Sequence, residues 1–189
     1  MSKKVLIVGG VAGGASAAAR LRRLDENAEI IMFERDEYIS FANCGLPYYI
    51  GEIIKEREQL LVQTPESMKS RFNIDVRINS EVINIDTVKK IATIKSKVKG
   101  VYEEPYDYMV LSPGARAIKP NIEGINNPKI FTLRNIPDTD NIKAYVDKKG
   151  VKTAVVIGGG YVGVEMSENL KHRGLEVTIV EVAPLHKVV

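Results

Sequence analysis

The chain has 189 residues, of which 44% are hydrophobic and 27% charged, as is usual for a globular protein. A formal net charge of +3, scattered along the chain, is too weak to favour a nucleic-acid or membrane partner. One cysteine excludes an internal disulfide and a multi-cysteine zinc site, and two histidines argue against any metal site. No apolar run is long enough for a signal peptide or a membrane span, so we expect a cytoplasmic protein.

The N-terminal residues predict a strand, a glycine-rich turn and a helix. The apolar run 4–8 indicates a buried parallel strand, and the alanine-rich run 15–21 favours a helix. The turn between them is Gly9, Gly10, Val11, Ala12, Gly13 and Gly14. Backbone N–H groups of such a turn, together with the helix N-terminus, bind a pyrophosphate. The match to G-x-G-x-x-G is imperfect because Val11 takes the place of the second glycine, which normally lets the phosphates approach closely.

An acidic residue follows the next predicted strand. Residues 29–33 form an apolar run that ends in Glu34, about 20 residues beyond Gly14, the spacing expected of an acid that binds a ribose hydroxyl. The alternative is a solvated acid at a strand end. Because loop, helix, strand and acid occur in the expected order, we favour dinucleotide binding.

The first helix also carries a basic face. Ser16, Arg20 and Arg23 have the spacing i, i+4, i+7 and therefore share one side. Arginine matches the geometry of phosphate, so this face is a candidate clamp for a phosphorylated ligand. Composition alone favours the alternative, a solvated surface near a helix C-terminus.

The only cysteine lies in the segment 40–51. Gly45 and Pro47 follow Cys44, and proline is tolerated in the first turn of a helix. A cysteine just ahead of a helix faces unpaired backbone donors and the positive end of the helix dipole, which favour thiolate over thiol. The alternative is a lone buried cysteine that packs as a small hydrophobe. Glycine-rich loops on both sides of Cys44 favour the reactive interpretation.

The middle of the chain predicts an antiparallel β segment. A short helix is expected over 65–72, followed by antiparallel strands around 74–78, 82–85, 91–94 and 102–105. Another buried strand at 108–111 leads into the turn Ser112-Pro113-Gly114-Ala115, where the chain could pass close to a ligand. A linker and a helix over 137–148 come next.

A second and cleaner nucleotide unit follows. The strand 153–157 leads into a full G-x-G-x-x-G at 158–163, then a helix over 164–173 and a strand over 176–180. Glu181 ends that strand and favours a free ribose 2′-hydroxyl, hence NADH over NADPH. His186 and Lys187 lie nearby and leave NADPH open.

Two dinucleotide loops with a cysteine between them resemble the flavin- and pyridine-nucleotide-dependent disulfide oxidoreductases. The residues at 40–48, Ser-Phe-Ala-Asn-Cys-Gly-Leu-Pro-Tyr, closely resemble the single-cysteine coenzyme A-disulfide reductases, and the likeness continues at 63–66, 111–115 and 133–135. It implies an α/β fold with two Rossmann-like three-layer units, the first interrupted by an antiparallel β segment and the second truncated. We expect an FAD-binding domain at 1–118, a linker and helix at 119–150, and the start of an NAD(P)H-binding domain at 151–189.

The resemblance implies FAD on the first loop and NAD(P)H on the second, with hydride passing from nicotinamide to flavin and electrons from flavin to Cys44. Cys44 would cycle through a mixed disulfide with coenzyme A. Tyr161 resembles a residue that covers the flavin until the nicotinamide arrives, and Glu165 one beside it. The expected cofactor-binding residues are Gly9, Gly10, Val11, Ala12, Gly13, Gly14, Glu34, Arg35, Asn43, Val82, Ser112, Pro113, Gly114, Arg134, Gly158, Gly160, Tyr161, Gly163, Glu165 and Glu181. The expected coenzyme A contacts are Ser16, Arg20, Arg23, Ser40, Asn43 and Arg71.

Two departures from the family pattern bear on function. Related NADH peroxidases and water-forming oxidases carry a histidine where this chain has Ala12, which counts against peroxide chemistry. Family members are also more than twice as long, so the chain resembles the N-terminal part of an enzyme that is homodimeric at full length. Three interpretations stay open: a reductase of coenzyme A disulfides or persulfides, an NADH oxidase, or a nucleotide-binding fragment without turnover. We expect the isolated chain to bind flavin weakly and to lack turnover.

Overall fold

The computed structural model describes residues 2–148 and 150–182, which divide into two units. The first unit comprises Met1–Phe41 and Leu61–Ala115, and the second comprises Ala42–Leu60 and Arg116–Val189. Within the described ranges, no helix combines the length and the apolar character that crossing a membrane would need.

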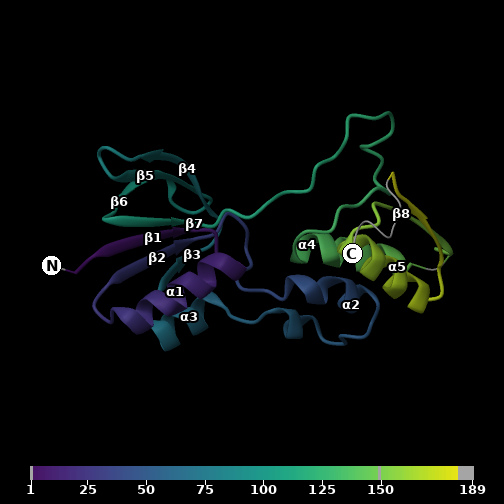
Figure 1. The fold of residues 1–189 in the computed structure, drawn as a ribbon, viewed down its shortest axis with the longest axis horizontal. Helices are drawn as coiled ribbons and strands as arrows, with labels where there is room; N and C mark the ends of the chain where they lie inside the picture. The colour runs from purple at the N-terminus through teal and green to yellow at the C-terminus, as the bar shows by residue number, and fades with distance from the viewer. Residues whose placement is uncertain (1, 149, 183–189) are drawn as a thin grey trace. The chain divides into compact units, whose positions relative to one another are not determined.

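A parallel sheet forms the centre of the first unit. Its strand order is β3-β2-β1-β7, where β1 is Lys4–Val8, β2 is Glu29–Phe33, β3 is Asp75–Arg77 and β7 is Tyr108–Leu111. Helices α1 (Ala12–Leu24) and α3 (Pro65–Phe72) lie on one face of this sheet (Figure 1). The antiparallel sheet of β4 (Ser80–Asp86), β5 (Ile91–Ser96) and β6 (Gly100–Pro105) covers the other face. The unit therefore has three layers.

Successive side chains of β1 and β2 point to opposite faces of the parallel sheet, so these strands contribute to a hydrophobic cluster on each face. Ile7 and Met32 pack with Ala15, Ala18 and Met68 in the cluster on the helical side, and all five are buried. A second cluster on the other side joins Leu6, Ile31 and Phe33 to Ala92 and Ile94 of β5. Strands buried on both faces read as continuous apolar runs, which is why these two strands were predictable from sequence.

The expected antiparallel strand at 74–78 is wrong in its direction. β3 runs parallel to β2, with Met32 opposite Val76. The alternation of apolar residues predicts a strand but not its partner. Helix α3 lies between β2 and β3 in the chain, and a crossover of this length returns the chain to the same end of the sheet, so the two strands pair in parallel. The antiparallel pairing of β4 with β5 and of β5 with β6 is confirmed.

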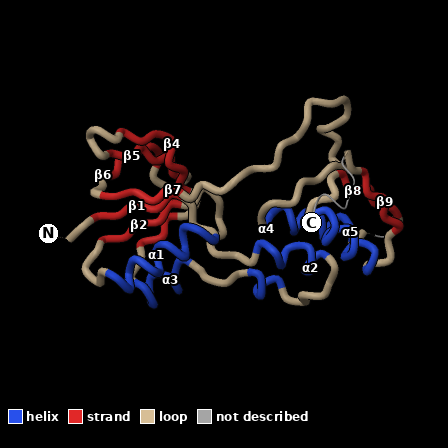
Figure 2. Tube along the Cα trace, viewed as in Figure 1, coloured by secondary structure: helices blue, strands red, loops and turns tan. Residues whose placement is uncertain are grey.

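The second unit packs three helices with a parallel strand pair. Helix α2 (Leu46–Ile50) contacts α4 (Ile136–Val146) and α5 (Tyr161–His172), and β8 (Thr153–Ile157) pairs with β9 (Glu176–Val180) (Figure 2). 3₁₀ turns lie at Asn43–Gly45 and Arg57–Leu60. Helix α5 starts at Tyr161 rather than at the expected residue 164 because Gly160 is already its N-cap.

Candidate nucleotide loops and cysteine segment

The first glycine loop joins β1 to α1 through a backbone contact that only glycine permits. Gly9 has a φ of +97°, and its N–H donates to the Phe33 carbonyl at 2.8 Å. A methyl group added at Gly14 would lie 1.7 Å from the Gly9 carbonyl oxygen. The start of α1 is therefore pressed directly against the loop, as expected of the third glycine of a dinucleotide-binding turn.

The second loop repeats this geometry. Gly158 has a φ of +105°, and its N–H donates to the Val180 carbonyl at 2.9 Å. A methyl group at Gly163 would lie 1.9 Å from the Gly158 carbonyl oxygen. The two loops thus share the turn, the strand contact and the close approach of the helix.

Val11 replaces the second glycine of the motif without needing a positive φ. It is the N-cap of α1 and has a φ of −87° and a ψ of −134°, whereas Gly160 at the same place in the second loop has a φ of −69° and a ψ of 176°. Neither φ requires glycine. The two loops therefore differ here in ψ as well as in the bulk presented to a ligand.

A carboxylate anchors each loop, a role that the sequence analysis missed. Glu34 is only 6% exposed; its Oε2 accepts the Gly10 N–H at 2.8 Å, and its Oε1 accepts the Asp36 N–H at 3.0 Å. In the second unit Glu181 accepts the N–H of Gly159 in the same way. An ionised carboxylate has about four acceptor positions, so Glu34, which accepts the two bonds from Gly10 and Asp36, keeps capacity for a ribose hydroxyl.

The two helices that follow the glycine loops begin without caps. Among the residues that the structure describes, neither α1 nor α5 has a side-chain cap, and neither has an acidic residue in its first turn. By contrast, Thr64 caps α3, with Glu66 in its first turn, and Asn135 caps α4, with Asp138 in its first turn. Uncapped N–H groups at the positive end of a helix dipole bind anions. The residues present therefore fit a pyrophosphate group at each loop.

The turn after β7 lies against the first loop. A methyl group at Gly9 would lie 2.0 Å from the Ser112 carbonyl oxygen, and one at Gly13 would lie 3.3 Å from Ser112 Oγ. The Ser112 N–H donates to the Val8 carbonyl at 2.8 Å, and Gly114 has a φ of +68°. Pro113 and Gly114 are exposed. The predicted ligand-facing turn and the glycine loop are thus neighbours in the first unit.

Other expected cofactor residues occupy varied surroundings. In the first unit Val82 packs against the cluster of Phe33 and Ile94, whereas Arg35 is exposed and pairs with Asp36 at 4.0 Å. Three further expected cofactor residues belong to the second unit. Tyr161 is the first residue of α5 and is 71% exposed, and Glu165 and Arg134 are half-buried. His186 and Lys187 lie outside the described residues.

Cys44 lies in the second unit, in the 3₁₀ turn Asn43–Gly45 that leads into α2. Its side chain is exposed, so the alternative of a buried cysteine is wrong. Pro47 occupies the first turn of α2, as predicted. The neighbouring Asn43 has a buried Oδ1 atom that finds no hydrogen-bond partner within the described part of the chain. A solvent-accessible thiol beside an unpaired acceptor is suited to a bound reactant rather than to core packing.

The basic face lies in the first unit. Ser16, Arg20 and Arg23 on α1 are exposed, as is Arg71 on α3, and none of these arginines has a salt bridge among the described residues. Arg22, which the sequence analysis passed over, donates to the carbonyl of Phe72 at 2.8 Å. That bond ties α1 to the end of α3 within the first unit.

Two expected coenzyme A contacts belong to different units. The Ser40 N–H donates to the Gly10 carbonyl at 2.9 Å, which places Ser40 beside the first loop, and its φ of +41° marks a tight turn there. Asn43 belongs to the second unit.

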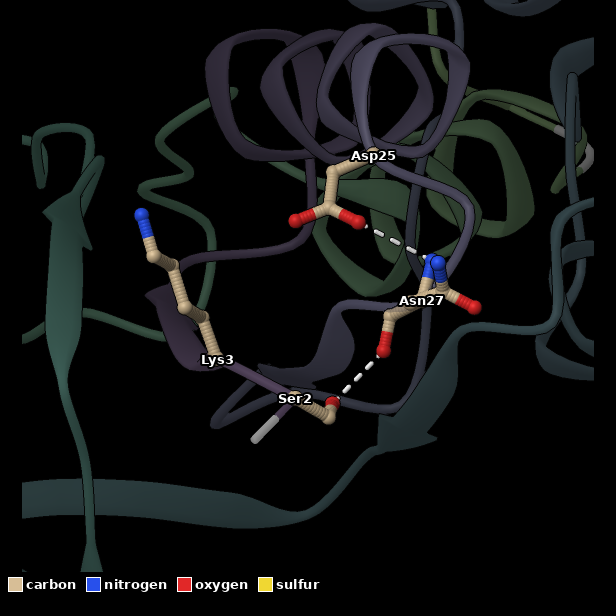
Figure 3. Close-up of a pocket in the computed structure, with 4 residues that line it drawn as sticks. All are labelled: Ser2, Lys3, Asp25 and Asn27. Atoms are coloured by element: carbon tan, nitrogen blue, oxygen red, sulfur yellow. Dashed lines mark hydrogen bonds between the residues drawn. The ribbon is translucent and has the colours of Figure 1, made fainter.

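A surface pocket of the first unit lies away from the glycine loop of that unit. Ser2, Lys3, Asp25 and Asn27 line it, and Figure 3 shows the hydrogen bond from Ser2 Oγ to the Asn27 carbonyl, which is 2.6 Å long. The pocket lies where β1 begins, whereas Gly9 follows the end of β1. It is therefore at the opposite end of the strand from the candidate nucleotide site.

Comparison with known proteins gives consistent matches along the chain. A family model described as pyridine nucleotide-disulphide oxidoreductase matches residues 3–186. A coenzyme A disulfide reductase from Staphylococcus haemolyticus is 45% identical over 179 residues, which are 94% of this chain and 40% of that relative. The chain thus spans about 40% of the length of the curated relatives it matches.

Solved structures match as well. The structure of reduced Bacillus anthracis CoADR-RHD has a TM-score of 0.93 and 62% identity, covering 97% of this chain and 33% of that one. A NAD-dependent persulfide reductase from A. fulgidus has a TM-score of 0.89 and 37% identity, covering 93% of this chain and 33% of that one. These likenesses confirm the resemblance and the α/β fold class predicted from sequence.

Proposed function

The chain belongs to the pyridine nucleotide-disulphide oxidoreductase family, and we propose that it carries the nucleotide loops and redox cysteine of an enzyme that reduces coenzyme A disulfide or related disulfides and persulfides. One observation carries this proposal. An exposed cysteine, Cys44, occurs in the same chain as two glycine loops whose helices begin with uncapped, positively polarised N–H groups.

The loops would hold FAD and NADH. In the first loop, the N–H groups at the start of α1 would bind the FAD pyrophosphate. The remaining acceptor positions of Glu34 would bind a ribose hydroxyl of FAD. The second would hold NADH at the start of α5, where the Glu181 carboxylate disfavours the 2′-phosphate of NADPH. Bound together, FAD and NADH would supply the two electrons that disulfide reduction requires.

Cys44 would exchange with the substrate. Its thiolate attacks one sulfur of coenzyme A disulfide, a Cys44–coenzyme A disulfide bond forms, and the original bond breaks with release of one coenzyme A thiolate. Two electrons then cleave the mixed disulfide, which restores the Cys44 thiolate and releases the second coenzyme A thiolate. Arg20, Arg23 and Arg71 would attract the phosphates of coenzyme A, because they are exposed and lack carboxylate partners among the described residues.

Mixed-disulfide formation tests this proposal without any cofactor. The chain is incubated with coenzyme A disulfide or with uncharged hydroxyethyl disulfide, and adducts are followed by intact mass spectrometry. We expect one adduct per chain, removable by dithiothreitol and absent from Cys44→Ser, and a faster reaction with coenzyme A disulfide. Equal rates with the two disulfides in the unaltered chain would contradict the substrate class.

The basic face has its own test in the same assay. Arg23→Ala should slow the reaction with coenzyme A disulfide about tenfold or more, through loss of a charge-assisted contact, and leave hydroxyethyl disulfide unaffected. Lys95→Ala, which removes an exposed charge from β5, is the matched control. If Arg23→Ala slows both disulfides equally, the arginines are only a solvated surface.

A further inference from the structure

The segment that carries Cys44 is packed onto the helix that begins at the second glycine loop. Residues 42–60 belong to the second unit, and within them Ile50 is fully buried. Ile50 shares a cluster with Met166 and Leu170 of α5 and with Ile142 of α4. The apolar side of α2 is thus embedded between these two helices, and the chain around Cys44 takes its position from them.

Arg173, just after the last turn of α5, fastens the end of α2. Its guanidinium donates to the Ile50 carbonyl at 2.9 Å and to Asp147 Oδ1 at 2.6 Å, and it lies 3.6 Å from Glu52. Its side chain is only 16% exposed. A planar guanidinium that spans a backbone carbonyl and two carboxylates holds its partners in one geometry, which a single flexible charge would not do.

A second contact, between Gly51 and Asn169, brings the end of α2 directly against α5. A methyl group at Gly51 would lie 2.0 Å from Oδ1 of Asn169, which is 2% exposed. The Asn169 side chain is itself fixed, since its Nδ2 donates to the Glu165 carbonyl at 2.8 Å. The Gly51 backbone and the Asn169 side chain are therefore in direct contact, and no larger residue fits at position 51 unless one of them shifts.

A second anchor fixes the far end of the segment. Arg57 forms a two-pronged ion pair with Asp140 of α4, with Nε–Oδ1 and Nη2–Oδ2 distances of 2.9 and 2.7 Å. The Ala42 N–H donates to the Leu60 carbonyl at 2.8 Å and closes the base of the segment. The segment that carries Cys44 is thus held at its base, at the end of α2 and at the 3₁₀ turn Arg57–Leu60.

From these contacts we propose that Arg173 is a positioning residue for Cys44, an inference that rests on the redox role proposed for that cysteine. Arg173 does not touch a reactant. It links the glycine loop at one end of α5 to the cysteine segment at the other, across a helix of 12 residues, roughly 18 Å at the standard rise. The order of Cys44 therefore depends on the C-cap residue of the helix that begins at the second glycine loop.

A spin label tests this directly, because the chain has one cysteine. A nitroxide on Cys44 should become more mobile in Arg173→Ala, with a correlation time shortened about twofold or more. It should stay mobile in Arg173→Lys, whose single flexible charge cannot span the three partners. Lys171→Ala removes a neighbouring exposed charge and is the matched control. Unchanged label mobility in Arg173→Ala would overturn the proposal.

Hydrogen exchange separates positioning from general stability. Arg173→Ala should speed exchange of amides at 51–54 about tenfold or more, while β8 and β9 change little. An equal rise in β8 and β9 would mean that Arg173 only stabilises the unit, and would also overturn the proposal. Should Arg173→Ala fail to fold, Asp147→Asn, which removes the charge of a carboxylate bound by Arg173, must mobilise the label instead. Neither measurement involves disulfide reduction, so their failure is distinguishable from failure of the proposed function.

Discussion

Adding one methyl group at Gly14 should destabilise the first unit, whereas adding one at the adjacent Gly13 should not. At Gly14 the new carbon would lie 1.7 Å from the Gly9 carbonyl oxygen and 3.1 Å from the Ile7 side chain. The obstructing oxygen belongs to the backbone, so no rotamer change can relieve the clash. At Gly13 the nearest atom is the rotatable Ser112 Oγ, at 3.3 Å.

The magnitude follows from two opposing contributions. Overpacking costs about 1–3 kcal/mol and more where the backbone must move, whereas replacing glycine by alanine within a helix gains up to about 1 kcal/mol. Gly14→Ala should therefore lower the free energy of unfolding by roughly 2 kcal/mol or more. Gly13→Ala should change it by between zero and about 1 kcal/mol in the stabilising direction.

Urea unfolding, read by pulsed hydrogen exchange of peptides from β1, α1 and β2, measures the first unit separately from the second. The two variants differ only in which glycine receives the methyl group. Equal unfolding midpoints for Gly13→Ala and Gly14→Ala would refute the argument that the helix start is pressed against the loop.

Two further predictions concern the second loop and acid stability. Gly163→Ala should destabilise β8 and β9 in exchange experiments because its methyl group would lie 1.9 Å from a backbone oxygen, whereas Gly160→Ala, with nothing within 4 Å, should spare stability but weaken NADH binding in calorimetry. In the first unit, burial alone would raise the pKa of Glu104, but hydrogen bonds from Lys4 and Arg77 outweigh it, so the pKa lies below its ordinary value of 4.5. Because the pKa of Glu104 is lower in the folded chain than in the unfolded chain, its ionised carboxylate stabilises the fold at pH values above about 4.5. That stability is lost as the pH falls further, so the urea midpoint of the first unit should decrease below about pH 4.5. Glu104→Gln should flatten that fall, and an equally steep acid limb would contradict the assignment.

Local sequence determines the parts of the fold that were predicted correctly. The strands at 4–8 and 29–33 are continuous apolar runs. The turn at 9–14 follows from Gly9, whose positive φ few other residues can adopt, and from Gly14, which lies against the Gly9 carbonyl. The same holds at 153–163, because the signals lie within a few residues of the structures that they specify.

Contacts between distant residues account for what the sequence could not supply. The pairing of β3 with β2 depends on a crossover, and the contact of Gly9 with Ser112 joins residues about a hundred positions apart. The hydrogen bond from the Gly10 N–H to Glu34 was not predicted, because an acid about 20 residues after the loop is already explained by a ribose contact. Nothing near Cys44 in the sequence indicates that its segment packs on α4 and α5, since Arg173 and Asp140 lie far along the chain.

The chain passes between its two units at residues 41–42, at 60–61 and again at 115–116. Any gene fragment that ends within the linker after Ala115 would therefore retain residues 42–60 while losing α4 and α5, the helices that bury Ile50. The complementary fragment would keep those helices with their packing surface uncovered. Neither piece would be an independently folding half in the usual sense, and mixing the two is a complementation experiment in which Cys44 recovers its surroundings only on reassembly. Experiments that separate the nucleotide sites by truncation would thus alter the cysteine as well, and internal deletion of 42–60 is the cleaner genetic dissection.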